Sequence, residues 1–131
     1  MTERPVHPTE LDADAVRVLR FGAVTRNAHR IHYDAGLAGA EGLDAPVVMA
    51  QLHGCGFFRA AAEWVGDPAA VLSVSWRNRA PAPAGSRLVV TGTVREVRDD
   101  RAVLDLEQHC DGDTVCCHGS AVVRLPSPEV P

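Results

Sequence analysis

Residues 47–65, VVMAQLHGCGFFRAAAEWV, form the only long apolar stretch of the sequence without a proline. Apolar side chains recur in it at intervals of three and four, the period of an α-helix: Val48, Leu52, Cys55, Phe58, Ala62 and Val65. Because the helix is small or apolar on nearly every side, we expect it to be buried. Gly54 and Gly56 each cost about 1 kcal/mol relative to alanine, so we expect them to mark close contacts with a sheet or another backbone. Residues 66–68, Gly-Asp-Pro, should end the helix.

Four β-rich segments follow this helix, and turn residues separate them. They are AVLSVSWRNRAP (70–81), RLVVTGTVREVR (87–98), RAVLDLEQHC (101–110) and TVCCHGSAVVRL (114–125). Consecutive strands of this kind predict an antiparallel meander with one face covering the helix. Before the helix, the alternation in VRVLRFGAVT (16–25) predicts another strand. A short helix should begin after Asp34, which is a good N-cap residue.

Composition excludes several classes of protein. The chain has 131 residues, 46% hydrophobic and 23% charged, and a net charge of −4 with no basic cluster, which argues against nucleic-acid binding. The start is polar and acidic where a secretory signal needs a basic end and an apolar run. No apolar stretch is long enough for a membrane span, so we expect one domain over residues 1–131 in the cytoplasm.

The four cysteines are Cys55, Cys110, Cys116 and Cys117, and no two form a Cys-x-x-Cys pair. In the cytoplasm they should be reduced. Neighbouring residues of a strand point to opposite faces, so Cys116 and Cys117 should not share a side. A zinc site with His109 or His118 is therefore not expected, and the cysteines are interpreted as buried or partly buried thiols.

The octapeptide NAHRIHYD (27–34) concentrates polar chemistry in an otherwise apolar region. An imidazole titrates near neutral pH and suits general acid–base catalysis. Together with FGAVTR before it, with EGLDAPVVMAQL (41–52) and with WRNRAPAPAGSRLVVTGTV (76–94), it resembles the MaoC-like family of (R)-specific enoyl-thioester hydratases and 3-hydroxyacyl-thioester dehydratases. The likeness is greatest to the branch of mitochondrial-type dehydratases and mesaconyl-CoA hydratases. It covers about residues 16–125 and implies an α+β hotdog fold, an antiparallel sheet wrapped around a long central helix.

The resemblance also implies roles for individual residues. The hydratase signature places an aspartate five residues before a catalytic histidine, and here Asn27 and His32 hold those positions. His32 would then be the base. Asn27 cannot donate a proton as a carboxylic acid does, but its amide can orient a hydroxyl or a water.

The helix entry departs from the family pattern. Its usual Val-His-Gly is Val48-Met49-Ala50 here, and Gln51 replaces a proline. The backbone N–H of Ala50 still offers an oxyanion donor at a helix N-terminus. The expected substrate contacts are His29, Arg30, Tyr33, Met49 and Gln51.

Several of these residues also have a purely structural interpretation. His29 more often packs a loop, and Arg30 more often pairs with a carboxylate than with a substrate phosphate. Tyr33 would equally fill a dimer core, and His53, three residues after Ala50, reads as core or pocket wall.

The resemblance implies a hydro-lyase that interconverts a 3-hydroxyacyl thioester and its 2-enoyl thioester, bound to coenzyme A or acyl carrier protein, in a bacterial biosynthetic pathway. It implies no cofactor and no metal, and a homodimer or dimer of dimers. Two alternatives stay open: a hotdog thioesterase, although Glu63 lies too near the helix end to serve it comfortably, and a repurposed domain that catalyses another step or binds a ligand without turnover.

Overall fold

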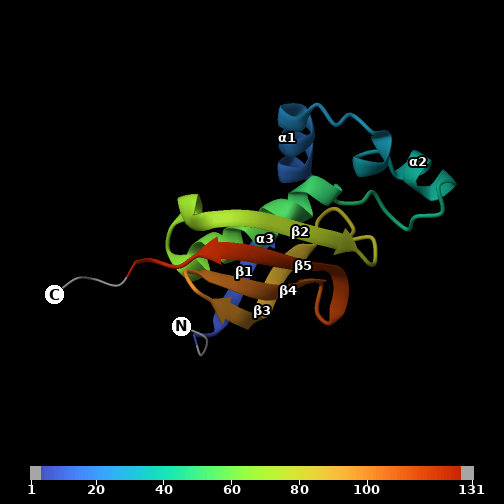
Figure 1. Ribbon diagram of the computed structural model, residues 1–131. Helices are drawn as coiled ribbons and strands as arrows, with labels where there is room; N and C mark the ends of the chain where they lie inside the picture. The colour runs from blue at the N-terminus through green and yellow to red at the C-terminus, as the bar shows by residue number, and fades with distance from the viewer. Residues whose placement is uncertain (1–3, 128–131) are drawn as a thin grey trace.

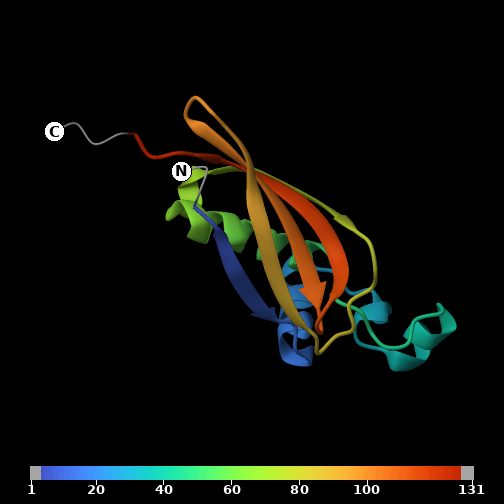
Figure 2. The same ribbon diagram turned by 90° about the horizontal axis from the view of Figure 1, so that it is seen from below.

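The computed structural model describes residues 4–127 as an α+β structure with one five-stranded antiparallel sheet (Figure 1). The elements are β1 Val6–Asp12, α1 Ala15–Thr25, η1 Arg30–His32, α2 Ala35–Ala40, α3 Ala50–Val65, η2 Pro68–Ala70, β2 Val71–Asn78, β3 Arg87–Arg98, β4 Arg101–Cys110 and β5 Thr114–Arg124. The sheet curves around α3, while α1, η1 and α2 gather at one end of it (Figure 2). This is the predicted hotdog arrangement of a sheet wrapped around a central helix.

The core lies between α3 and the inner face of the sheet. Its large apolar side chains are at most 6% exposed: Leu52, Phe57, Trp64, Leu88, Val90, Leu104, Leu106 and Val123. Burial alternates strictly along β4, where every second residue from Ala102 to Cys110 points inward. The opposite face of the sheet is polar, so only one face is covered by the helix, as predicted.

Helix α3 confirms the predicted central helix and its glycine contacts. A Cβ atom on Gly54 would lie 2.5 Å from the Trp76 ring, and one on Gly56 would lie 2.5 Å from Gln108 Nε2. Side chains from the sheet therefore occupy the space that a side chain at either position would need. The helix ends at Gly66, whose φ of 81° is left-handed and suits glycine.

One face of α3 is exposed to solvent in the single chain, so the prediction that the whole helix is buried is wrong for one chain alone. Cys55 is exposed and Phe58 is 42% exposed, although both belong to the predicted apolar stripe. The single sheet covers only one side of the helix, which leaves this apolar face uncovered.

The four predicted strands are confirmed, but their order is only partly a meander. β3, β4 and β5 are hairpin neighbours, whereas β2 pairs with β5 at the far edge. The link after β2 does not turn back into β3. It crosses the end of the sheet and pairs with the segment before α3, since Val48 N donates to Ala82 O at 2.8 Å and Val47 bridges Pro83.

The strand predicted for residues 16–25 is wrong, because this segment is helix α1. Asp14 caps it by accepting a hydrogen bond from Arg17 N at 2.8 Å. The first strand is instead β1, which the polar appearance of the N-terminal segment concealed. β1 is an edge strand that contains Pro8 and shifts register between Val6 and Thr9, so it shows no regular alternation.

The expectation that Cys116 and Cys117 occupy opposite sides is also wrong. Gln108 pairs with Cys117 and His109 pairs with Val115, so Cys116 is the extra residue of a β-bulge. Both cysteines are 0% exposed as a result. All four cysteines are free thiols, as predicted, but the prediction of a buried or partly buried thiol is wrong for Cys55, which is exposed on α3. Within residues 4–127, no helix is long and apolar enough to cross a membrane.

Candidate active site

The loop between α1 and η1 presents Asn27 and His32 to each other. Helix α1 ends at Arg26, whose φ of 57° is left-handed, and Asn27 N then donates to Gly22 O at 2.8 Å. This turn reverses the chain and folds the asparagine back beneath α1. Asn27 Nδ2 lies 3.4 Å from His32 Nε2, so the two residues of the expected pair meet.

The tautomer of His32 follows from its second neighbour. His32 Nδ1 lies 2.7 Å from the carbonyl oxygen of Val47. A carbonyl only accepts hydrogen bonds, so Nδ1 carries the proton and Nε2 keeps a free lone pair. Asn27 Nδ2 donates toward that lone pair. His32 is 9% exposed, and its Nε2 atom is an acceptor that faces Asn27.

The same segment ties this loop to the start of α3. Val47 N donates to Ile31 O at 3.0 Å, so the residues before α3 run beside η1. Met49, the N-cap residue, makes no side-chain capping bond. The N–H groups of Ala50 and Gln51 belong to the first turn, where no intrahelical acceptor exists, and the helix dipole adds partial positive charge there. They are available to an oxyanion.

A cavity of about 250 Å³ lies between α1, the loop that follows it and Met49, the N-cap residue of α3, and it reaches His32. Its apolar end is formed from α1 and its polar end from the loop: Val18, Leu19, Gly22, Ala23, Met49, Asn27, Ala28, His32 and Tyr33. Met49 is 1% exposed, and the methyl carbon of its side chain would lie 3.5 Å from a Cβ atom on Gly22. The residue that replaces the family's histidine thus closes the floor of this cavity.

The other predicted contact residues lie around the loop and mostly have local partners. His29 is exposed, and its Nδ1 accepts a hydrogen bond from Ile31 N at 3.2 Å at the start of η1. Arg30 is paired with Asp34, with Nε and Oδ2 3.1 Å apart. Tyr33 is 55% exposed and donates to Ala28 O at 3.1 Å. Gln51 is exposed in the first turn of α3.

Asp34 is the predicted N-cap of α2. Its side chain accepts from Leu37 N at 3.1 Å. That backbone hydrogen bond, together with the Arg30 guanidinium, holds the pKa of the Asp34 carboxyl below its usual value.

The sequence does not predict the role of the Val47 carbonyl, which orients the His32 imidazole by accepting a hydrogen bond from its Nδ1. No side-chain pattern marks a backbone acceptor, and this one depends on how the segment before α3 is placed. A larger concave surface, about 820 Å³, lies on the polar outer face of the sheet between residues such as Ser75, Thr91 and Ser120. None of residues 27–34 lines it, so it is not the site described here.

The chain matches a known protein family in sequence and known proteins in structure. Residues 1–84 match the family described as hydroxyacyl-thioester dehydratase type 2. The chain belongs to this family. The resemblance to MaoC-like hydratases and dehydratases is thereby confirmed, and the protein is a hydro-lyase of the dehydratase/hydratase type. A search of curated protein sequences gave no match.

Solved structures share the fold of this dehydratase family member. The (R)-hydratase from A. caviae involved in PHA biosynthesis is 21% identical, with a TM-score of 0.81 over 93% of this chain and 96% of that chain. A chain of the ChsH1-ChsH2 complex from Mycobacterium tuberculosis is 18% identical, with a TM-score of 0.84 over 96% of this chain and 100% of that one. R-hydratase PhaJ1 from Pseudomonas aeruginosa is 19% identical, with a TM-score of 0.81 over 95% and 86%.

Proposed function

We propose that this family member interconverts a 3-hydroxyacyl thioester and its 2-enoyl thioester, carried on coenzyme A or acyl carrier protein, with His32 as the catalytic base. The observation that carries the proposal is the orientation of one imidazole. Val47 O holds the proton on Nδ1 and leaves Nε2 unprotonated, facing Asn27 Nδ2. His32 lines the polar end of the cavity, which Met49, the N-cap residue of α3, also lines.

In the dehydration direction, His32 Nε2 removes a proton from the carbon next to the thioester carbonyl. The electron pair of that C–H bond moves toward the carbonyl oxygen, which gains negative charge. The N–H groups of Ala50 and Gln51 stabilise it, and losing one such donor typically costs about 10²–10³ in rate. The C–O bond to the 3-hydroxyl then breaks, the imidazolium returns its proton to the leaving oxygen, and water departs.

Asn27 serves this sequence as a positioning group. Its amide accepts from His29 N at 3.3 Å through Oδ1 and faces His32 Nε2 with Nδ2. Because an amide supplies no acidic proton, the imidazole performs both proton transfers on one face of the substrate. Hydration is the reverse, with Asn27 orienting the attacking water.

The remaining predicted contact residues would bind the two ends of the substrate, the acyl group and the thioester arm. The acyl group enters the apolar end of the cavity, where Met49 limits its depth. The thioester arm leaves past Tyr33 and His29, which are exposed. Arg30 offers a guanidinium to a carrier phosphate in exchange for its surface pair with Asp34, a pair that contributes little to stability.

The thioesterase alternative gains no support from the carboxylate on the central helix. Glu63 lies 13 residues after Ala50, and at 1.5 Å per residue that is roughly 20 Å along the helix. It bonds to Arg59 and Thr9 instead. A water activated by Glu63 would not reach a thioester held at the start of α3.

We also propose that the chain forms a homodimer. The face of α3 that includes Phe58 is not covered within one chain, and β2 lies at the edge of the described sheet. A second copy of the chain would cover this face of α3 and add a strand beside β2. The ChsH1-ChsH2 relative is itself a complex of two chains.

The test of function is a paired assay with a short (3R)-hydroxyacyl-coenzyme A and its enoyl counterpart. Enone absorbance reports interconversion, and free thiol reports hydrolysis. We expect interconversion without thiol release and a loss of about 10²–10⁴ in kcat for His32→Ala, the usual contribution of general acid–base catalysis. His118→Ala is the matched control, since His118 is exposed on β5 and belongs to neither the loop nor the cavity, and it should keep most of the activity. Thiol release without interconversion would overturn the dehydratase proposal, and turnover unchanged in His32→Ala would remove His32 as the base.

A further inference from the structure

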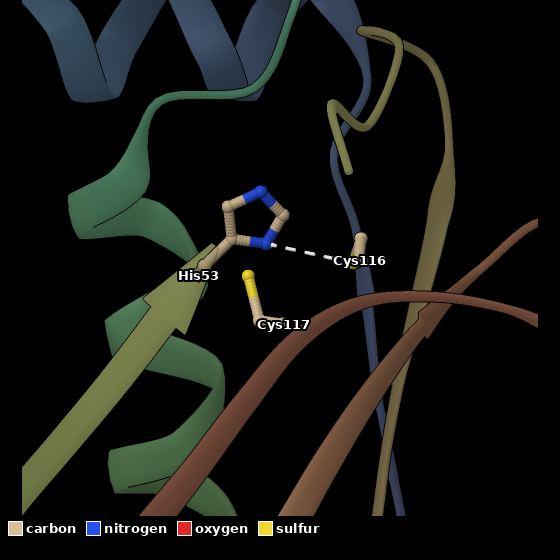
Figure 3. Close-up of side chains that lie close together, drawn as sticks. All are labelled: His53, Cys116 and Cys117. Carbon is tan, nitrogen blue, oxygen red and sulfur yellow. Dashed lines mark hydrogen bonds between the residues drawn. The ribbon is translucent and has the colours of Figure 1, made fainter. Parts of the chain in front are cut away.

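A second cluster of reactive side chains lies in the core beneath the sheet. A ring nitrogen of His53, Cys116 Sγ and Cys117 Sγ all lie within 4.8 Å of one another, and Figure 3 shows both cysteines near the imidazole of His53. His53 is 2% exposed, and both cysteines are 0% exposed. The proposed dehydratase reaction uses none of the three.

The bulge in β5 creates this cluster. A regular strand would send one of two consecutive side chains outward. Because Cys116 is the extra residue opposite Gln108 and His109, both thiols enter the core. His53 arrives from α3, which the close contacts at Gly54 and Gly56 hold against the sheet. Two rigid elements thus fix the three potential ligand atoms, as a preformed metal site requires.

Two side-chain amides border the cluster and offer oxygen atoms. Cys117 Sγ donates to Asn78 Oδ1 at 3.1 Å. His53 Nδ1 hydrogen-bonds to Gln108 Oε1. Gln108 is 0% exposed, and within residues 4–127 its Nε2 has no hydrogen-bond partner. An unpartnered amide nitrogen in a core costs about 1–3 kcal/mol, so packing alone is a poor reason for glutamine at this position.

We propose that His53, Cys116 and Cys117 form a binding site for a thiophilic divalent cation of the zinc class, with Gln108 Oε1 as the fourth ligand. Thiolate and imidazole ligands in a tetrahedral set are typical of Zn²⁺. With Zn–S of about 2.3 Å and Zn–N of about 2.0 Å, sulfur and nitrogen ligands in a tetrahedral set lie roughly 3.5 Å apart. The observed distance from Cys116 Sγ to His53 Nδ1 is 4.0 Å, so this pair needs a shift of about half an ångström, and all three ligand atoms already lie within 4.8 Å of one another.

Binding requires both thiols to release their protons to solvent and the imidazole proton of His53 to move from Nδ1 to Nε2, so that the neutral ring binds through Nδ1. Loss of the Nδ1 proton also frees Gln108 Oε1, which now accepts from it, to turn toward the cation. Since His53 lies three residues after Ala50, the cation would anchor the first turns of α3 to β4 and β5. Its role is therefore structural, and it stands apart from His32.

The experiment titrates the intact, reduced protein with Co²⁺ as a spectroscopic substitute and with Zn²⁺ in competition. We expect one Co²⁺ per chain with a thiolate-to-cobalt charge-transfer band, which Zn²⁺ abolishes. Cys116→Ser and Cys117→Ser should each weaken binding at least 100-fold. The matched control, Cys55→Ser, removes an exposed thiol and should leave the band unchanged.

A second measurement covers the case in which a cysteine variant folds poorly. Zn²⁺ should raise the Tm of the wild-type protein and of Cys55→Ser. It should also lower by two the number of thiols that react with a thiol reagent, because Cys116 and Cys117 would be bound to the metal. His53→Gln should abolish both effects while keeping both cysteines. Absence of the charge-transfer band in the wild-type protein, or a band that persists in His53→Gln and both cysteine variants, would overturn the proposal.

Discussion

The chemistry of the proposed active site depends on which nitrogen of one histidine carries a proton. Val47 O determines it by accepting from His32 Nδ1 at 2.7 Å. Asn27 then faces the unprotonated nitrogen with an amide that can orient but cannot acidify. In the proposed reaction, asparagine in place of the signature aspartate therefore leaves both proton transfers to His32.

The first prediction concerns Asn27. Asn27→Ala removes the amide between His29 N and His32 Nε2, so the hydroxyl or water loses its orientation. We expect kcat to fall about 10²-fold, as for other misplaced reacting groups, with a smaller change in KM. Asn27→Asp keeps a polar side chain of the same size and adds a group that can act as an acid. Its kcat should therefore stay within about tenfold of the wild-type value. Steady-state kinetics in both reaction directions provide the measurement, and wild-type kcat in Asn27→Ala would contradict the proposed role.

At the scale of elements, α3 and β2 to β5 were predictable because their patterns repeat along the chain. The strand predicted at 16–25 is wrong, because the sequence of α1 contains a short alternation that a strand also allows, whereas the N-cap at Asp14 favours a helix. The edge strand β1, interrupted by Pro8, could not be recognised from periodicity. The bulge at Cys116 was equally hidden, because it depends on the pairing of β5 with β4.

The glycine contacts of α3 give a second prediction. Gly54→Ala places a methyl group 2.5 Å from the Trp76 ring, and overpacking of this kind costs about 1–3 kcal/mol. Gly39→Ala is the control, since a Cβ atom there meets no atom within 4 Å, and alanine favours a helix by up to about 1 kcal/mol. Urea unfolding should show a lower midpoint for the first variant and an equal or higher one for the second. Equal stability of Gly54→Ala and wild type would disprove the close approach of β2 to α3.

The cap of α2 gives a pH-dependent prediction. The pKa of Asp34 is lowered in the folded chain by the hydrogen bond from Leu37 N and by Arg30. A folded-state pKa below the unfolded value means that the carboxylate stabilises the fold above the ordinary aspartate pKa of about 3.9, and that this contribution disappears as pH falls through the lower folded value. Asp34→Asn mimics the protonated acid, so it should lower Tm at pH 7 and match wild type in strong acid.

Thermal unfolding between pH 2 and pH 7 measures this convergence. Asp44→Asn, at an exposed position in the loop after α2, serves as the control and should run parallel to wild type across the range. A constant gap between Asp34→Asn and wild type at every pH would assign the effect to packing and not to charge.

For the whole molecule, the curved sheet leaves half of its central helix uncovered. One chain thus has an apolar helix that its own strands cannot bury, with Phe58 42% exposed. Beside it, β2 has a partner on one side only, and such an edge is a template for pairing with another strand. Both features point to a second copy of the chain, related by a twofold axis that uses the same surface on each subunit.

The last prediction tests this dimer. Phe58→Glu places a charge in the centre of the proposed interface, where it would be desolvated without a partner. We expect wild type to have twice the chain mass of 14.0 kDa in light scattering, and Phe58→Glu to have the single mass. Arg98→Glu changes an exposed charge at the β3–β4 turn, away from α3, and should stay dimeric. Because Phe58 lies two helical turns beyond Ala50, a monomeric Phe58→Glu that keeps its fold also shows whether one chain suffices for catalysis. Wild type at the single mass in the tens of micromolar would refute the homodimer.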